Sequence, residues 1–440
     1  MDVLVEGNGD WILEPQTTSG MRTISLDTRG RLVEFSAVPP QFTTENPNPQ
    51  TNADWSPAFS AAELDLSKFK ETAPNWTPPV AFDTRMAWEG VLPDHTEIPL
   101  RVEAAAFQGK IVFFELIYPW TKPDVEAADN TTTRDWVGIF ILAGIGIGVI
   151  ITAIFLARKH IKSGSGDRKG AFKILLVVLG LTFCGVFLSM NHVPAFFPEL
   201  DRFSHASRLG LFAAAFTWLM YLALEPYIRR NLPELIVSWN RLLVGDWRDP
   251  LVGRDVLFGT LFGIAHITLI FAGRSAERFF NNDLAILPFR VNESLSGLRF
   301  SAAAIMSNFG FGFVSGFMPI CGLVILFLLL RRRLYAEIAI FILLATVQIL
   351  FFTHSLVYLP FTLTISVMLT LLISRFGLVA NVMSGIVFAC IQQSLFTLNF
   401  SAWYASSMFL TVFLILLLLG YGFKISLANQ PLFGERLARE

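Results

Sequence analysis

Cysteine and charged residues are both scarce in this chain. Of 440 residues three are cysteines, all within apolar segments where a thiol acts as a small hydrophobe: Cys184, Cys321 and Cys390. The first third has none, which excludes an internal disulfide there. Charged residues make up 16% of the chain and apolar residues 53%, whereas soluble proteins have about 25% charged residues. This composition carries more apolar surface than one water-soluble core can bury and indicates a membrane protein.

Motifs that would identify an enzyme are also missing. HExxH, GxSxG and the kinase elements HRD and DFG do not occur. The run Phe262 to His266 (FGIAH) matches the FxxxH element of the bacterial CPBP metalloproteases, but the Glu-Glu pair that this family also uses is absent. We therefore predict no catalytic, cofactor-binding or metal-binding residue. An intramembrane protease is the least favoured function.

The chain divides into two regions that suit different solvents. Residues 1–135 have no apolar run near the ~20 residues that cross a bilayer, whereas most of 136–440 is apolar. The first region holds 21 Asp or Glu and 10 Lys or Arg; the second holds 14 and 24. The basic residues flank hydrocarbon segments, where anionic lipid headgroups explain them, so nucleic acid is not expected as a partner.

We predict a small α+β domain over residues 1–135. Alternating apolar residues predict β-hairpins over Arg22 to Phe35 and Ile98 to Tyr118, the second turning at Gln108-Gly109. A helix is expected over 61–69, behind Ser60 as a cap. Core packing is favoured over a sugar- or peptide-binding platform for four tryptophans: Trp55, Trp76, Trp88 and Trp120.

A polytopic α-helical membrane domain with about nine transmembrane helices is expected over residues 136–440. The apolar spans are 136–157, 171–190, 207–224, 256–273, 301–330, 335–352, 355–373, 376–397 and 404–423. The fifth would be about 45 Å long as one helix, against a ~30 Å hydrocarbon core. We therefore expect it to divide into an interfacial piece and a shorter span, and counts of eight to ten remain open.

Basic residues in the connecting loops predict the orientation. Loops after odd-numbered spans, with the C-terminal tail, hold 18 Lys or Arg, and loops after even-numbered spans hold six. The positive-inside rule then places the odd loops and the C-terminus in the cytoplasm and residues 1–135 outside, in a bacterial inner membrane. Residues 1–15 have neither a basic start nor an apolar stretch, so we expect that a span or signal precedes Met1 in a longer gene product.

The long loop at Glu225 to Asp255 predicts an amphipathic cytoplasmic helix over 231–245, with Asn231 and Glu234 as capping pair and Gly245 as stop. Lying in the headgroup layer is the favoured interpretation, and docking of a cytoplasmic partner is the alternative. Internal salt bridges are expected among Arg248, Asp249, Arg254 and Asp255. The candidate interface residues are Arg229, Arg230, Trp239, Arg241, Trp247, Arg248 and Arg254.

Polar residues and glycine pairs mark the spans themselves. Polar positions weighed as a pathway are His266, Asn308, Gln348, His354, Gln392 and Gln393, of which His266, Gln348 and Gln392 are the site candidates. Interhelical hydrogen bonding is favoured for the amides. Close helix approach is expected at three glycine pairs of four-residue spacing: Gly144/Gly148, Gly259/Gly263 and Gly312/Gly316.

Several long stretches resemble one family. LEPYIRRNLPELIVSWNRLLVGDWRDPLVGRD, with GRLVEFSAVPPQ, MAWEG, PLRVEAAAFQGK and the closing SAWYASSMFLTVFLILLLLGYGFKISLANQPLFG, resembles the C-terminal region of bacterial serine/threonine protein kinases of the acidobacterial type. The resemblance implies a cytoplasmic kinase domain, one span, an extracytoplasmic domain and a multi-span region. The kinase domain and first span are absent from this chain, so kinase activity is not carried over.

Three functions follow as hypotheses. The leading one is a non-catalytic membrane sensor or anchor region whose outer domain responds to an unidentified ligand and whose helices relay this to a kinase or other cytoplasmic partner. The second is a transporter-like or channel-like protein, which predicts that His266 and Gln392 line a shared polar cavity. The intramembrane protease is the third.

Overall fold

The computed structural model describes residues 19–27, 29–42, 53–121, 133–192, 194–281, 297–352, 355–402 and 404–428. Contacts divide the chain into two compact units, Asp10–Asn130 and a helical unit whose main part is Thr131–Glu440. Each unit is described by itself.

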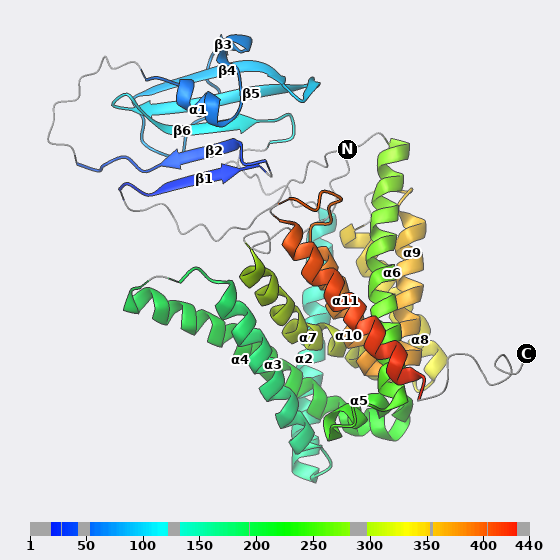
Figure 1. Ribbon diagram of the computed structural model, residues 1–440. Helices are drawn as coiled ribbons and strands as arrows, with labels where there is room; N and C mark the ends of the chain where they lie inside the picture. The colour runs from blue at the N-terminus through cyan, green and yellow to red at the C-terminus, as the bar shows by residue number, and fades with distance from the viewer. Residues whose placement is uncertain are drawn as a thin grey trace, which may run out of the picture. The chain divides into compact units, whose positions relative to one another are not determined.

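The first unit is a six-stranded antiparallel sheet with strand order β1-β2-β6-β5-β4-β3 (Figure 1). Both predicted hairpins are present: β1 pairs with β2, and β5 pairs with β6. Gln108 and Gly109 turn the second hairpin with φ of 50° and 74°, the left-handed pair that two-residue hairpin turns require. The strands are β1 (Arg22–Leu26), β2 (Leu32–Ala37), β3 (Lys70–Thr72), β4 (Thr84–Leu92), β5 (His95–Phe107) and β6 (Lys110–Ile117).

The helix expected over 61–69 is wrong in its boundaries. The chain forms α1 (Ser56–Ala61) and a short 3-10 helix, η1 (Leu66–Lys68). Pro57 starts α1 earlier because proline suits the first turn of a helix. Glu63 then adopts a left-handed φ of 54°, which ends the helical path, and Asp65, not Ser60, provides a cap by accepting the Ser67 N–H.

Trp88 lies at the centre of the core on one face of the sheet. It is buried, and its ring meets Trp55 and Phe59 edge-on with centroids 5.7 and 5.2 Å apart. Trp76 and Trp120 lie outside the buried clusters, and Trp120 stacks on Tyr118 at 5.1 Å. Core packing therefore applies to Trp88 and Trp55 only.

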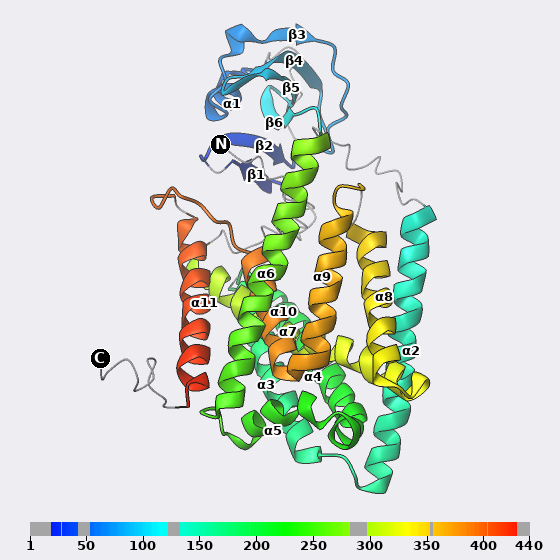
Figure 2. The same cartoon turned by 90° about the vertical axis from the view of Figure 1, so that its right-hand side faces the viewer.

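The second unit is a bundle of long helices (Figure 2). Within the described residues, eight helical stretches are long and apolar enough to cross a membrane. The chain is thus a multi-pass membrane protein. The helices are α2 (Thr133–Ser163), α3 (Arg168–Ser189), α4 (Phe196–Asn231), α5 (Val237–Val244), α6 (Pro250–Asn281), α7 (Leu298–Leu330), α8 (Arg333–Phe352), α9 (Leu359–Leu371), α10 (Gly377–Gln392) and α11 (Ala405–Ser426).

One of the eight stretches, Leu359–Gln392, contains a reversal. It consists of α9, a π-helical turn η4 (Leu372–Phe376) and α10, and Gly377 between them has φ of +81°. Tyr358, just before α9, packs on Gly273 near the C-terminal end of α6, so α9 starts there and runs antiparallel to α6. In contrast, α10 packs first on Gly259 and then on Gly263, so it runs parallel to α6. α9 and α10 are therefore antiparallel, which accounts for the two expected spans 355–373 and 376–397.

The expected division of the fifth span is wrong, because α7 is one helix of 33 residues with Pro319 inside it. The glycines of α7 allow neighbouring helices to pack closely and do not interrupt the helix. A side chain at Gly310 would overlap Thr182 of α3, and one at Gly312 or Gly316 would overlap Ile386 or Val382 of α10. α7 thus occupies the middle of the bundle.

Two of the three glycine pairs give close helix approach, as predicted. Gly259 and Gly263 lie against the backbone of α10, with an added Cβ at 263 only 2.7 Å from the Ser384 carbonyl oxygen. The third prediction is wrong: nothing lies within 4 Å of a Cβ built at Gly144 or Gly148. The seam between α6 and α10 is therefore tight, and the corresponding face of α2 is open.

Candidate functional site: the α5 pole

The candidate site is the end of the helical unit that carries α5, which we call the α5 pole (Figure 1). The helix predicted over 231–245 divides here: α4 continues to Asn231, a 3-10 turn η2 (Pro233–Leu235) follows, and α5 begins at Val237. Gly245 ends α5 in the left-handed conformation, as predicted. The capping pair is wrong, because Asn231 donates to the Tyr227 carbonyl and Glu234 pairs with Arg333.

The apolar face of this segment points into the protein and not into a headgroup layer. Leu235, Ile236 and Trp239 are each 3% exposed or less. The Trp239 ring packs edge-on against Phe313 and Phe317 of α7, at 5.8 and 5.4 Å. Amphipathic periodicity cannot distinguish a lipid surface from a protein core, and here the core takes that face.

Arg333 connects three segments at this pole, namely its own helix α8, the turn η2 and the turn η4. Its guanidinium pairs with Glu234 of η2 at 2.6 Å and with Glu337 of α8 at 2.9 Å, and donates to the Ser374 carbonyl of η4 at 2.7 Å. Arg375 adds a second contact to Glu337 at 3.6 Å. A planar guanidinium with several fixed donors suits such a junction. The sequence analysis missed this role.

Salt bridges near α6 agree with the prediction in part. Arg254 pairs with Asp255, whose other carboxylate oxygen accepts the Ser238 hydroxyl of α5. Asp249 pairs with Arg241 and not with Arg248. Burial raises the pKa of Asp249, but the hydrogen bond and charge of Arg241 together with the backbone N–H groups of Leu251 and Val252 outweigh it, and the net pKa lies below the usual value.

Three more segments join the α5 pole through backbone carbonyls. Lys173 of α3 donates to the Leu243 carbonyl at 3.0 Å, and Tyr421 of α11 donates to that of Trp247. Arg229 of α4 donates to the Ser165 carbonyl at 3.2 Å. Distant parts of the chain therefore converge on η2 and α5.

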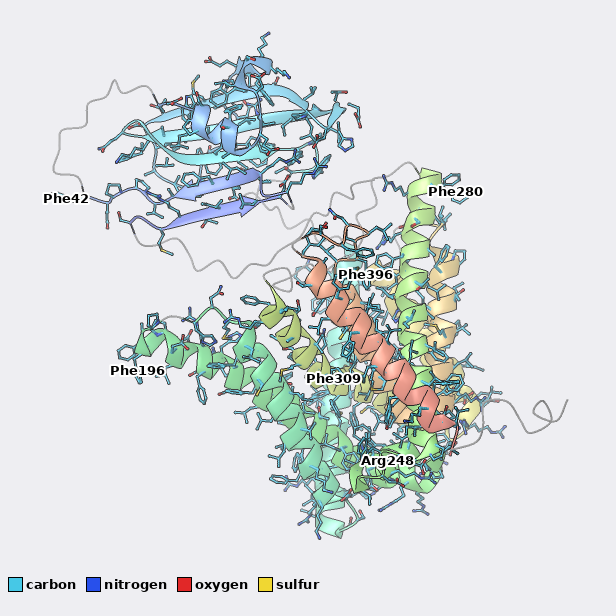
Figure 3. All side chains as sticks on the ribbon, in the orientation of Figure 1. Phe42, Phe196, Arg248, Phe280, Phe309 and Phe396 are labelled. Atoms are coloured by element: carbon cyan, nitrogen blue, oxygen red, sulfur yellow. The ribbon has the colours of Figure 1, made fainter. Side chains whose placement is uncertain are left out.

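An exposed surface remains around the end of α5. Val244 is 84% and Trp247 54% exposed, and Arg248 lies 5.4 Å over the Trp247 ring. Figure 3 shows Arg248 at the α5 pole. We call this the Trp247 surface and define it by five exposed residues, among which the exposed Asp246 also lies: Arg230, Leu242, Val244, Trp247 and Arg248. Of the predicted interface residues, Trp239 is in the core, and Arg229, Arg241 and Arg254 are engaged in ion pairs.

Inside the bundle, polar side chains of α7, α10 and α11 meet around a small cavity. Asn308 donates to Gln393 at 2.9 Å, which confirms the expected interhelical bonding for these two amides. The Ser394 and Thr411 hydroxyls lie 2.6 Å apart, and the buried Ser407 hydroxyl has no hydrogen-bond partner among the described residues. The cavity has a volume of about 10 Å³, which is room for about one water molecule.

The polar positions predicted as site candidates do not converge at this cavity. His266 stacks on Phe388 of α10, with ring centroids 4.4 Å apart. Neither His266 nor Gln392 is among the residues that line the cavity, and Gln348 lies on α8, outside it as well. His354 lies outside the described residues.

Comparison with known proteins adds no identity. No protein-family model matches the chain, and no curated protein or solved structure is similar to it.

Proposed function

We propose that this chain is a non-catalytic membrane sensor or anchor region, whose helical unit presents the Trp247 surface to a cytoplasmic partner. The observation that carries the proposal is the convergence of four helices, α3, α6, α7 and α8, on η2 and α5, beside an exposed patch of mixed apolar and charged character. The Arg241–Asp249 ion pair and the hydrogen bond from Ser238 to Asp255 connect α5 to the start of α6 next to the patch. Exposed aromatic and arginine side chains are the residue types that dominate protein interfaces.

The partner we propose is a serine/threonine kinase domain. Its support is the resemblance of the chain to the membrane region of bacterial kinases of this type. A helical unit joined to a separate β-sheet unit is the kind of architecture in which one part binds a stimulus and the other relays it.

The proposed setting is a bacterial inner membrane, with residues 1–135 outside and the α5 pole in the cytoplasm. The support is electrostatic: 18 of the 24 Lys and Arg after residue 135 fall in the loops on the side of the α5 pole or in the C-terminal tail. The turn at 164–167 joins that end through the bond from Arg229 to Ser165, and the turn at 331–332 and the π-helical turn η4 meet there through the bond from Arg333 to Ser374.

Cysteine accessibility in intact cells tests the orientation. Ser67→Cys places a thiol on an exposed site of the sheet unit, and Asp246→Cys places one on the α5 pole. A membrane-impermeant maleimide should label the first variant in intact cells and the second only after permeabilisation. The wild-type chain controls for its own cysteines. Labelling in the reverse order would contradict both the orientation and the sensor proposal.

Transport is the alternative and has a separate test. The support for sensing over transport is the packing of the bundle around α7, where the polar cavity holds about one water molecule. Purified protein in sealed proteoliposomes should therefore pass no Na⁺, K⁺ or H⁺ above protein-free vesicles. A flux that disappears in His266→Leu would favour the transporter.

A further inference from the structure

A groove opens on the helical unit where α2 ends and α3 begins. It has a volume of about 410 Å³, and its walls are Ile161, Arg168, Phe172, Trp218 and Leu222, contributed by α2, α3 and α4. Phe172 is 57% exposed, and Trp218 is half-buried. The groove is therefore an aromatic and aliphatic trough with a single cation in its wall.

The guanidinium of Arg168 is held at this groove with donors to spare. Its Nη2 donates to the Ile161 carbonyl at 2.7 Å, whereas a guanidinium has five N–H donors. Asp167, next to it in sequence, is occupied elsewhere: its carboxylate accepts the Gly170 N–H and the Tyr221 hydroxyl. Arg168 is thus anchored at one edge and not neutralised by a paired carboxylate in the described contacts.

The turn between α2 and α3 beside the groove is basic, and the nearby Glu225 of α4 pairs with Arg229. Asp167 is the only carboxylate between residues 158 and 173, a stretch that holds six cations: Arg158, Lys159, Lys162, Arg168, Lys169 and Lys173. Such a basic cluster at the end of membrane-spanning helices attracts anionic lipid headgroups. Tryptophan and other aromatic rings at the same depth suit the boundary between headgroups and acyl chains.

We propose that this groove binds an anionic glycerophospholipid of the adjacent leaflet. The lipid phosphate accepts hydrogen bonds from the free N–H groups of Arg168, because a guanidinium matches a phosphate in two-point geometry. The upper part of the acyl chains lies along Phe172 and Trp218. The groove volume is in the range of small-molecule sites. The inference is independent of the proposed sensor function, since it needs only a bilayer around the helices.

Quenching by brominated lipid tests the site. The full chain is placed in phosphatidylcholine nanodiscs that contain increasing fractions of phosphatidylglycerol brominated on its acyl chains. Tryptophan fluorescence is measured for wild type and for Trp218→Phe, and the quenching seen only in wild type reports lipid in the groove. Brominated phosphatidylglycerol should quench Trp218 more than brominated phosphatidylcholine at equal fraction. Arg168→Gln should weaken this preference about fivefold.

Two variants separate the site from general charge and from folding. Lys424→Gln removes one exposed cation from α11 and should keep the preference. Phe172→Glu leaves Arg168 in place but puts a negative charge in the exposed wall of the groove. It should reduce quenching by brominated phosphatidylglycerol and leave quenching by brominated phosphatidylcholine unchanged. Equal quenching by the two lipids in wild type would overturn the proposal. The proposal would also be overturned if soluble glycerol 3-phosphate abolished the quenching of Trp218, because this would indicate a free phosphate as ligand.

Discussion

Gly377 lies directly against the backbone of Leu235, so closely that a Cβ at position 377 would overlap the Leu235 carbonyl oxygen. The contact joins η2 to the reversal between η4 and α10. Gly377 also has φ of +81° and ψ of −162°, a conformation almost restricted to glycine that costs another residue about 1–3 kcal/mol. One glycine thus meets a conformational and a packing requirement at once.

Gly377→Ala should therefore destabilise the helical unit by at least about 1–3 kcal/mol. The measurement is thermal unfolding in detergent, followed by helical circular dichroism. Gly420→Ala is the matched control, because nothing lies within 4 Å of a Cβ at that position and it lies within α11. Equal melting temperatures for the two variants would contradict the contact.

Leucine at Gly316 should disrupt the bundle, whereas leucine at Gly148 should be tolerated. Both glycines lie within long apolar helices, but Gly316 packs on Val382 of α10 and Gly148 faces open space. Overpacking in a close-packed interior costs about 1–3 kcal/mol or more. Size-exclusion profiles and melting temperatures in detergent measure the difference. A similar loss in both variants would place a neighbour opposite α2 that the structure does not show.

Trp239→Ala should lower the stability of the protein, whereas Trp247→Ala should lower its binding to a partner. Removing the buried Trp239 ring should cost about 3–5 kcal/mol of stability, and removing the exposed Trp247 ring should change it by less than about 0.5 kcal/mol. Under the proposed function, Trp247→Ala and Arg248→Gln should instead weaken binding of a kinase domain, measured with purified components. Unchanged binding in both variants would remove the Trp247 surface as the docking site.

The β1–β2 hairpin should lose stability in acid. Burial raises the pKa of Asp27, but the hydrogen bonds from Arg31 and Arg29 outweigh it and hold that pKa below its usual value. The hydrogen bond from Arg31 likewise lowers the pKa of Asp94. A carboxyl group whose pKa is lower in the folded state stabilises the fold above its unfolded pKa, about 3.9. This stabilisation is lost as the pH falls through the folded-state value.

Arg31→Met should flatten that acid dependence and reduce protection at neutral pH. Hydrogen–deuterium exchange of strand peptides from the full chain, corrected for the intrinsic rate at each pH, measures both effects. Arg22→Met, an exposed arginine on the same hairpin, is the control and should leave the profile as in wild type. If Arg31→Met kept the wild-type slope below about pH 4, the ion pairs would not be its cause.

Local patterns predicted the elements that depend on local physics. The hairpins follow from residue alternation, and Gln108-Gly109 supplies the turn at one of them. The stop of α5 at Gly245 follows from the freedom of glycine to adopt a left-handed conformation. The helix near residue 60 was misplaced because a proline and a left-handed glutamate, Glu63, decide its ends, and the conformation of a glutamate cannot be read from sequence.

Long-range contacts were beyond sequence reasoning. The apolar face of α5 has the same periodicity whether it meets lipid or Phe313 and Phe317, so only the fold decides between them. Arg333 belongs to a run of three arginines that looks like any cytoplasmic flank, and its partner Glu234 lies 99 positions away. Gly144 and Gly312 have equivalent local patterns, yet only Gly312 has a helix opposite.

The contact of α6 with α10 at Gly259 and Gly263 leaves no layer of side chains that could change rotamer to accommodate sliding. The two helices must therefore travel as one body if the bundle changes shape. Sliding is less restricted at α2, because no described residue packs against the face that carries Gly144 and Gly148. A change in the shape of the bundle would accordingly move α2 against its neighbours α4 and α8 while α6 and α10 stay together.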